Sequence, residues 1–200
     1  ENFRFGKNRE GSLKDSESIF NKFFIKPTIC KLLKNDSQNV VSSQLIREKI
    51  RNGDLRKLND LLGRYWSIAG EVIFGDQNGT KIGFPTANVM INDIIQPEFG
   101  VYLTNTLIMR EDGKKFVSKK KLPSISNFGV RPTVNGTLPL LETHILNWNG
   151  IKEGLNLYKK RIYVEFLDFL RVEKKFSSFD QLKVQIKKDV IVAKKMHKIK

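Results

Sequence analysis

The chain has 200 residues, a mass of 23.1 kDa and 40% hydrophobic side chains, enough to bury one core together with a second small unit. It has no apolar run of the roughly 18 to 20 residues that a membrane helix needs, and the polar stretch from Glu1 to Gly11 does not fit a signal peptide. A peptide, a linker and a membrane protein are therefore excluded. Glu1 stands where Met would begin a protein, in a phrase typical of the middle of a domain, so we expect the sequence to be part of a longer one.

Cysteine and histidine usage excludes two further classes. Cys30 is the one cysteine, so an intramolecular disulfide is impossible. The two histidines, His144 and His197, lie far apart, and no Cys/His spacing suits a zinc site. We therefore expect a soluble protein of a reducing compartment, the cytoplasm, with Cys30 as an inert buried thiol.

The net charge of +15 is compatible with nucleic-acid binding, because a basic surface displaces counterions from a phosphate backbone. Of the 36 basic residues, however, 26 are Lys and 10 are Arg, whereas phosphate and base recognition favours the Arg fork. The lysines are spread along the chain, and no aromatic residues interleave with them as a stacking platform requires. We favour a solvated basic surface and no nucleic-acid partner; a nucleic-acid binder is an alternative that rests on charge alone.

The first 64 residues have helical patterns. A helix is predicted over 43–53, with Ser42 or Ser43 as N-cap and Gly53 as terminator. A second is predicted from Asp54 to Leu62, closed by Gly63. Their apolar stripes indicate core contacts rather than a binding groove.

The hydrophobic period changes after Tyr65. Alternating or apolar segments at 67–74, 100–109, 141–148 and 161–169 are separated by turn-rich spacers and predict short strands. Because no helices intervene, they favour an antiparallel barrel or sandwich. A closing helix is predicted after the Ser177–Ser178 cap. From the residues alone, the chain is a helical segment, a mainly β domain and a final helix.

The segment from Gly75 to Asn88 is the first candidate for chemistry. Its three glycines allow backbone amides to approach an anion, and Lys81 supplies a positive charge. Thr86 and Asn88 offer neutral oxygens two positions apart, which an extended segment places on one face, as ligands of one Mg²⁺ require. The Walker pattern is absent, so a P-loop is not supported. A plain hairpin with a tight turn is an equally good interpretation of these residues.

Glu142 is the second candidate. It stands within the apolar strand pattern Leu140–Ile145, where burying a carboxylate is costly unless it is paired or used. A desolvated carboxylate is a suitable base for a hydroxyl group. A solvent-facing strand Glu is the alternative, and the commoner one in general.

Several motifs, in order, resemble the riboflavin kinase module of bacterial bifunctional riboflavin kinase/FAD synthetases. Between Gly63 and Ala193 they are Gly83-Phe-Pro-Thr-Ala-Asn88, Gly100-Val-Tyr102, Asn127-Phe-Gly-Val-Arg-Pro-Thr133, Glu142-Thr-His-Ile145, Leu157-Tyr158 and Leu170-Arg-Val-Glu-Lys-Lys-Phe176. Two earlier segments, 1–11 and 41–47, are similar to the back part of that family's FMN adenylyltransferase domain.

The resemblance implies a fold and a division into domains. Residues 63–200 would form a six-stranded antiparallel Greek-key barrel with a C-terminal helix, so that the chain is mainly β. Residues 1–62 would be an α/β remnant of the nucleotidyltransferase domain. That domain's His-x-Gly-His phosphate-binding turn does not occur in these 200 residues, so FAD synthesis is not expected of the chain as given.

The resemblance also implies an activity: transfer of the γ-phosphoryl group of ATP to the ribityl 5′-hydroxyl of riboflavin, giving FMN and ADP. Glu142 would be the catalytic base, with Thr86 and Asn88 as Mg²⁺ ligands. Arg171 and Phe176 would bind the flavin. The remaining ATP-binding positions, beside Thr86 and Asn88, would be Gly75, Lys81, Gly83, Pro85, His144 and Tyr158.

The sequence departs from the family pattern at several positions. Thr80 stands where a basic residue is usual, Lys159 replaces a Gly, and Asn147 replaces a common Asp. These changes and the truncated front support an alternative, a flavin-binding or regulatory module of the same fold without turnover. The joint presence of Thr86, Asn88 and Glu142 favours the enzyme, because a binder needs no base. The sequence does not predict an oligomeric state.

Overall fold

The computed structural model describes residues 2–75, 77–91, 94–109, 120–133, 136–148 and 156–199. The chain forms two compact units, 1–45 and 46–200. No helix among the described residues is long and apolar enough to cross a membrane.

The first unit contains a short 3-10 helix η1 (Lys7–Arg9) and α1 (Leu13–Lys22). A capping box begins α1, in which the Ser12 backbone amide donates to Asp15 at 2.7 Å. Strand pairing among the described residues of this unit is limited to two isolated bridges, Phe5 with Gly11 and Lys34 with Val40. Cys30 is exposed, so the expectation of a buried thiol is wrong: the apolar neighbours Ile29 and Leu33 are exposed as well and form no core around it.

The helices α2 (Ser43–Arg51) and α3 (Leu55–Leu62) confirm the two helices predicted from the sequence. The Ser42 hydroxyl accepts from the Leu45 amide at 3.2 Å, and Gly53 and Gly63 end the two helices with left-handed φ values of 64° and 63°. Ile50, Leu55 and Leu58 pack into the same core as the barrel strands. The contacts thus join α2 and α3 to the barrel, while the assignment of 1–62 to a nucleotidyltransferase remnant stays a prediction.

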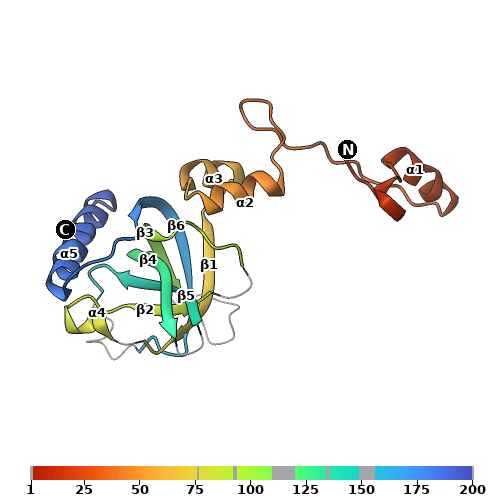
Figure 1. Ribbon diagram of the computed structural model, residues 1–200. Coiled ribbons are helices and arrows are strands. Elements are labelled where there is room, and N and C mark those ends of the chain that lie inside the picture. The colour runs from red at the N-terminus through yellow and green to blue at the C-terminus, as the bar shows by residue number, and fades with distance from the viewer. Residues whose placement is uncertain are drawn as a thin grey trace. The chain divides into compact units, whose positions relative to one another are not determined.

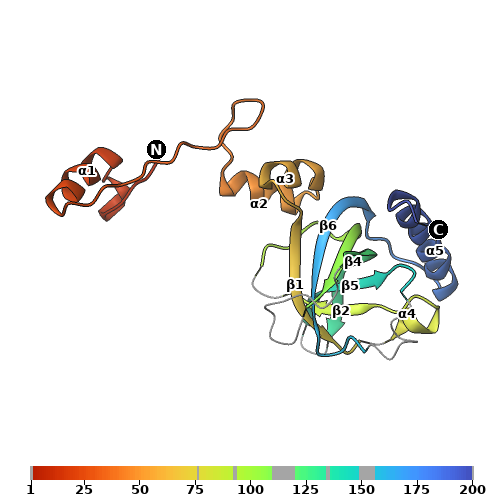
Figure 2. The ribbon, with the colours of Figure 1, turned by 180° about the vertical axis from the view of Figure 1, so that it is seen from behind.

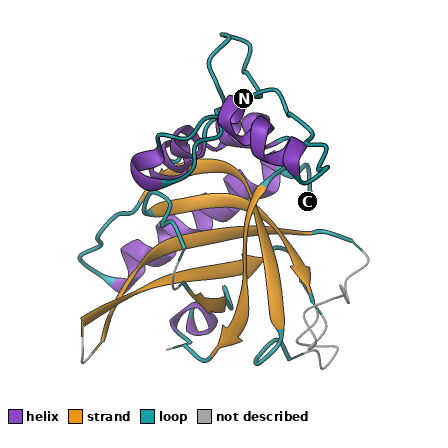
Figure 3. Ribbon diagram, turned by 90° about the vertical axis from the view of Figure 1, so that its right-hand side faces the viewer, coloured by secondary structure: helices purple, strands orange, loops and turns teal. Residues whose placement is uncertain are grey.

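Six antiparallel strands close into a barrel in the order β1-β2-β5-β4-β3-β6, as Figures 1 and 3 show. They are β1 (Trp66–Ile73), β2 (Ala87–Met90), β3 (Gly100–Ile108), β4 (Leu122–Thr133), β5 (Gly136–Ile145) and β6 (Arg161–Val172). β3, β4 and β5 follow one another as neighbours, and β2 lies beside β5, which is a Greek-key order. The predicted mainly β fold is confirmed; a short helix α4 (Asn78–Lys81) between β1 and β2 was not predicted.

Alternate residues of the strands pack into two different cores. Tyr102 of β3 and Leu141 of β5 belong to the core that fills the barrel, whereas Val101 and Leu103 pack with Val190 of α5 (Phe179–Met196). The helix α5 therefore covers the outside of the barrel, as Figures 1 and 2 show. Its start confirms the predicted cap, because the Ser178 hydroxyl accepts from the Gln181 amide at 3.3 Å. Both faces of β3, β4 and β5 are thus partly covered.

One part of the barrel interior is polar. Five buried hydroxyl side chains bond to one another at 2.8 to 2.9 Å between oxygens across β3, β4 and β5. They follow the order Thr106, Ser124, Thr104, Ser126, Thr143. Because each hydroxyl can both donate and accept, every one of the five has at least one hydrogen-bond partner within the set.

Candidate active site

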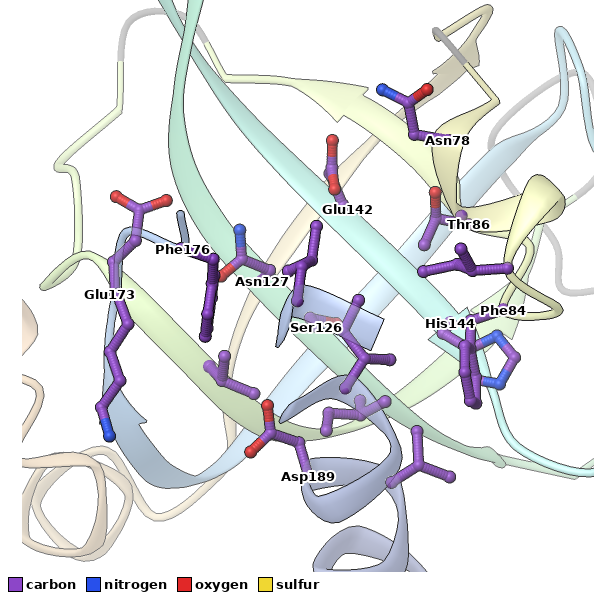
Figure 4. Close-up of a pocket in the computed structure, with 18 of the residues that line it drawn as sticks. Asn78, Phe84, Thr86, Ser126, Asn127, Glu142, His144, Glu173, Phe176 and Asp189 are labelled. Carbon is purple, nitrogen blue, oxygen red and sulfur yellow. The ribbon is translucent and has the colours of Figure 1, made fainter. Parts of the chain in front are cut away.

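Two pockets meet at Thr86. The first, which we call the Glu142 pocket, has a volume of about 210 Å³ and is lined from α4, β4, β5, α5 and the segment after β6 (Figure 4). The second, the Tyr158 pocket, has a volume of about 440 Å³ and includes Pro85, Trp148 and Tyr158 in its wall. Thr86 lines both.

Strand register places three polar residues side by side on the outer face of the barrel. Glu142 on β5 is directly opposite Asn88 on β2 and directly opposite Asn127 on β4. Directly opposed residues of antiparallel strands share a face, with Cβ atoms roughly 4.5 to 5.5 Å apart. The neighbours Leu141 and Thr143 are buried on the inner side, so Glu142 faces outward into the pocket. The carboxylate is half-buried rather than open to solvent.

Thr86 and Asn88 present their oxygens together, with Oγ1 and Oδ1 separated by 3.4 Å. Asn88 is buried, and a Cβ at Gly75 would lie 1.9 Å from its Nδ2, so Gly75 leaves the space that this amide occupies. Two neutral oxygens fit a Mg²⁺ ion that takes its other ligands from phosphates and water. Among the described residues, no group of three or more His, Cys, Asp or Glu side chains offers a different metal site.

The segment before Thr86 is shaped by close backbone contacts. A Cβ at Gly79 in α4 would lie 2.3 Å from the Phe84 carbonyl oxygen, and Gly83 adopts a left-handed φ of 87°. The Gly79 carbonyl accepts from the Phe84 amide at 2.8 Å. The glycines of this segment therefore fold α4 tightly against the segment that carries Thr86, just before β2. Lys81 lines neither of the two pockets, and its Nζ donates to Asn78 Oδ1 at 3.4 Å.

His144 holds the same segment from the other side. Its Nδ1 donates to the Pro85 carbonyl at 2.9 Å, and its ring meets Phe84 edge-on with centroids 5.5 Å apart. Burial lowers the pKa of His144; the bond to Pro85 opposes this shift, and the Lys194 charge adds to it. The imidazole is therefore neutral at physiological pH and holds Pro85, the residue that precedes Thr86.

Arg171 lines the Glu142 pocket, but its guanidinium is engaged by Asp189 of α5. Nε lies 3.0 Å from both carboxylate oxygens and Nη2 lies 2.6 Å from Oδ2. The Gln185 amide donates to Asp189 Oδ1 at 2.8 Å. This group joins the end of β6 to α5, which forms one wall of the pocket.

Aromatic rings lie in both pockets. Phe176 lines the Glu142 pocket. Tyr158 lines the other pocket and stacks on Phe74, with ring centroids 3.9 Å apart and planes at 19°. Each ring offers a flat apolar surface of the kind on which a heteroaromatic ring can stack.

The structure gathers most of the residues predicted from the sequence. The Glu142 pocket brings together Thr86, Glu142, His144, Arg171 and Phe176, and the Tyr158 pocket adds Pro85 and Tyr158. Gly75, Lys81, Gly83 and Asn88 line neither pocket, although Asn88 adjoins Thr86 and Gly75 leaves room for the Asn88 amide. The side chain of Arg131 lies outside the described residues. The roles assigned to all these residues stay predictions.

Sequence reasoning did not assign Asn127 or Asp189 to the site. Asn127 belongs to one of the motifs that carry the family resemblance, and its position opposite Glu142 follows from strand register. Asp189 stands among lysines but next to the apolar Val190 on the buried side of α5. A single acidic residue at a buried position of a basic helix is the signal that could have located this ion pair.

Comparison with known proteins gives a consistent family. A sequence model described as riboflavin kinase matches residues 62–197. The chain is 37% identical to the bifunctional riboflavin kinase/FMN adenylyltransferase of Haemophilus influenzae and 33% identical to that of Escherichia coli. Each alignment covers 97% of this chain and 58% of the relative. The chain therefore belongs to the riboflavin kinase family and spans somewhat more than half the length of these relatives.

A solved structure is also similar over most of the chain. A crystal structure described as a macrolide-efflux protein from Streptococcus pneumoniae superposes with a TM-score of 0.76 at 27% sequence identity. The match covers 96% of this chain and 58% of that one. The front segment of the chain is thus matched in known proteins together with the barrel.

Proposed function

We propose that this chain is a riboflavin kinase, which transfers the γ-phosphoryl group of ATP to the 5′-hydroxyl of the ribityl chain of riboflavin and releases FMN and ADP. Membership of the family supports the choice of substrates. The observation that carries the proposal is the register of β2 with β5. It sets Asn88 directly opposite Glu142, and Asn88 shares a face with Thr86. The two residues that would bind Mg²⁺ and phosphate therefore lie next to the candidate base.

Phosphoryl transfer requires little covalent chemistry from the protein, so catalysis depends mainly on positioning the substrates and compensating charge. Glu142 accepts the proton of the 5′-hydroxyl while the oxygen of that hydroxyl forms a bond to the γ-phosphorus. The bond from that phosphorus to the bridging oxygen breaks, and ADP leaves with the electron pair. The Tyr158 pocket receives the nucleotide and the Glu142 pocket receives the flavin, with Thr86 at the junction.

Thr86 and Asn88 would hold Mg²⁺ through their neutral oxygens. The ion, when bound, would compensate the charge on the phosphates. We place the activity in the cytoplasm and assign no nucleic-acid partner. We do not assign FMN adenylylation to these 200 residues, since their sequence has no His-x-Gly-His turn.

The proposal is tested by incubating purified chain with riboflavin, ATP and Mg²⁺ and separating FMN and FAD by chromatography. We expect FMN without FAD. Glu142→Gln should reduce FMN formation by roughly 100-fold or more, because the amide cannot accept the proton. Riboflavin binding, followed by quenching of flavin fluorescence, should stay near the wild-type level.

Glu48→Gln is the matched control, because Glu48 is an exposed residue of α2 that lines neither pocket. It should turn over like the wild type. Wild-type rates in Glu142→Gln would refute the assignment of the base. Riboflavin binding by the wild type without any FMN would instead favour the non-catalytic flavin-binding module.

A further inference from the structure

Asn127 is the polar neighbour of Glu142 on the side away from Asn88. It is directly opposite Glu142 in the β4–β5 pair and lines the same pocket. Ser126 and Phe128 are buried on the inner side of β4, so Asn127 faces outward with Glu142. In the view of Figure 4 its amide lies between Glu142 and the ring of Phe176.

The Asn127 amide is available to a ligand. It is half-buried, and within the part of the chain that the structure describes no hydrogen bond engages it. The next residue on the same face of β4 is Gly129, and a Cβ there would lie 3.4 Å from Asn127 Nδ2. A Cβ at Gly129 would also clash with Glu173 Oε1, so the missing side chain makes room there for the Glu173 carboxylate, which lines the same pocket as the amide.

The position of Glu142 determines which part of riboflavin lies next to the Asn127 amide in the proposed reaction. If the Glu142 carboxylate receives the proton of the 5′-hydroxyl, the ribityl chain must extend from Glu142 toward the bound flavin ring. Asn127 and Phe176 line the same pocket as Glu142, and Asn127 is directly opposite Glu142 on the neighbouring strand, so its amide adjoins the base. A side-chain amide both donates and accepts, as a hydroxyl group does, so the two form a well-matched pair.

We propose that Asn127 is a specificity residue that hydrogen-bonds the 4′-hydroxyl of the ribityl chain, the hydroxyl next to the one that is phosphorylated. This contact orients the 5′-hydroxyl on Glu142 and selects a polyol over an acceptor with a plain alkyl chain. The inference rests on the proposed function and adds a residue and a substrate feature to it. A site built to bond a hydroxyl rejects an analogue that lacks it, because the amide is then left unpaired.

The test compares riboflavin with 4′-deoxyriboflavin, which keeps the reacting hydroxyl. For the wild-type chain, kcat/KM should be roughly tenfold lower for the deoxy analogue, as expected for one lost hydrogen bond. Asn127→Ala should lower kcat/KM for riboflavin by a similar factor but leave the analogue nearly unchanged, so that the two substrates become equivalent. Asn127→Asp, which keeps the shape of the side chain and removes its donor, should also reduce the ratio between them.

Asn105→Ala is the matched control, because Asn105 lies on β3 and lines neither pocket. It should keep the wild-type ratio. A purely structural role for Asn127 would slow both substrates equally, so an unchanged ratio in Asn127→Ala and Asn127→Asp would overturn the inference while leaving the kinase intact. A wild-type chain that does not distinguish the two substrates would overturn it too, and one that phosphorylates neither would refute the proposed function itself.

Discussion

Thr86 stands at the junction of the two pockets, with its hydroxyl oxygen 3.4 Å from the Asn88 oxygen. A neutral oxygen is a weak ligand alone, and it is effective beside a second one and the phosphates of the nucleotide. The hydroxyl, and not the methyl group, is therefore the part of the side chain that the account requires.

We predict that Thr86→Ala raises KM for the Mg²⁺–ATP complex by about tenfold, the effect of one lost polar contact. Thr86→Ser should recover most of the affinity because it restores the oxygen. Initial rates against ATP at saturating riboflavin and fixed free Mg²⁺ measure this. Equal ATP dependence in the wild type and Thr86→Ala would exclude Thr86 as a ligand.

His144 links pH to stability through its bond to Pro85. Burial lowers its pKa below the ordinary value of 6.5 in the folded chain, so between the two values the unfolded chain binds more protons. Stability therefore falls as the pH drops from about 6.5 toward the folded pKa. The full contribution is present above that window.

We predict that the free energy of unfolding of the wild type falls more between pH 7 and about pH 5 than that of His144→Gln, which cannot titrate. Urea titrations at each pH measure it. His197 is present in both chains, so its titration cancels in the comparison. Parallel pH curves for the two chains would contradict this account of His144.

At the scale of elements, α5 is held to β6 by the pair of Arg171 and Asp189. Their side chains are only 17% and 11% exposed, and Gln185 completes the carboxylate's bonding. Removing one partner leaves a poorly solvated charge without its counter-ion. The pair therefore fixes the wall that α5 contributes to the Glu142 pocket.

We predict that Asp189→Ala lowers the free energy of unfolding by about 2 to 4 kcal/mol, since it leaves the Arg171 guanidinium without its counter-ion. Asp180→Ala, at an exposed position in the first turn of the same helix, should cost under about 1 kcal/mol. Urea unfolding of both variants checks this. A similar cost in Arg171→Ala and in the double variant would identify the pair as the cause, whereas additive costs would argue against it.

Local sequence patterns predicted α2, α3 and α5 but not α1, and they missed features that depend on pairing. The Ser42 and Ser178 caps and the Gly63 terminator act within a few residues of the chain, so sequence reasoning located them. Helix α4 was missed because its four residues include a glycine, and its fold depends on contact with the Phe84 carbonyl. A backbone contact of this kind produces no periodic pattern of hydrophobic residues in the sequence.

For the whole molecule, the alternation of strand residues predicted an antiparallel β domain, and the motifs added the barrel. The interior hydroxyls of Thr104, Ser126 and Thr143 could not be predicted, because polar residues in strands normally indicate an exposed face. They are buried because their partners come from three different strands. The position of Asn127 beside Glu142 likewise follows from register and not from either residue's neighbours in sequence.

The proposed kinase requires the barrel to bring ATP and riboflavin together at Glu142. This is measured by following label from [γ-³²P]ATP in a single turnover with riboflavin and Mg²⁺. We predict that the label appears in FMN with the wild-type chain and is lost from that product with Glu142→Gln. Riboflavin that binds to the wild-type chain but acquires no label would contradict the account.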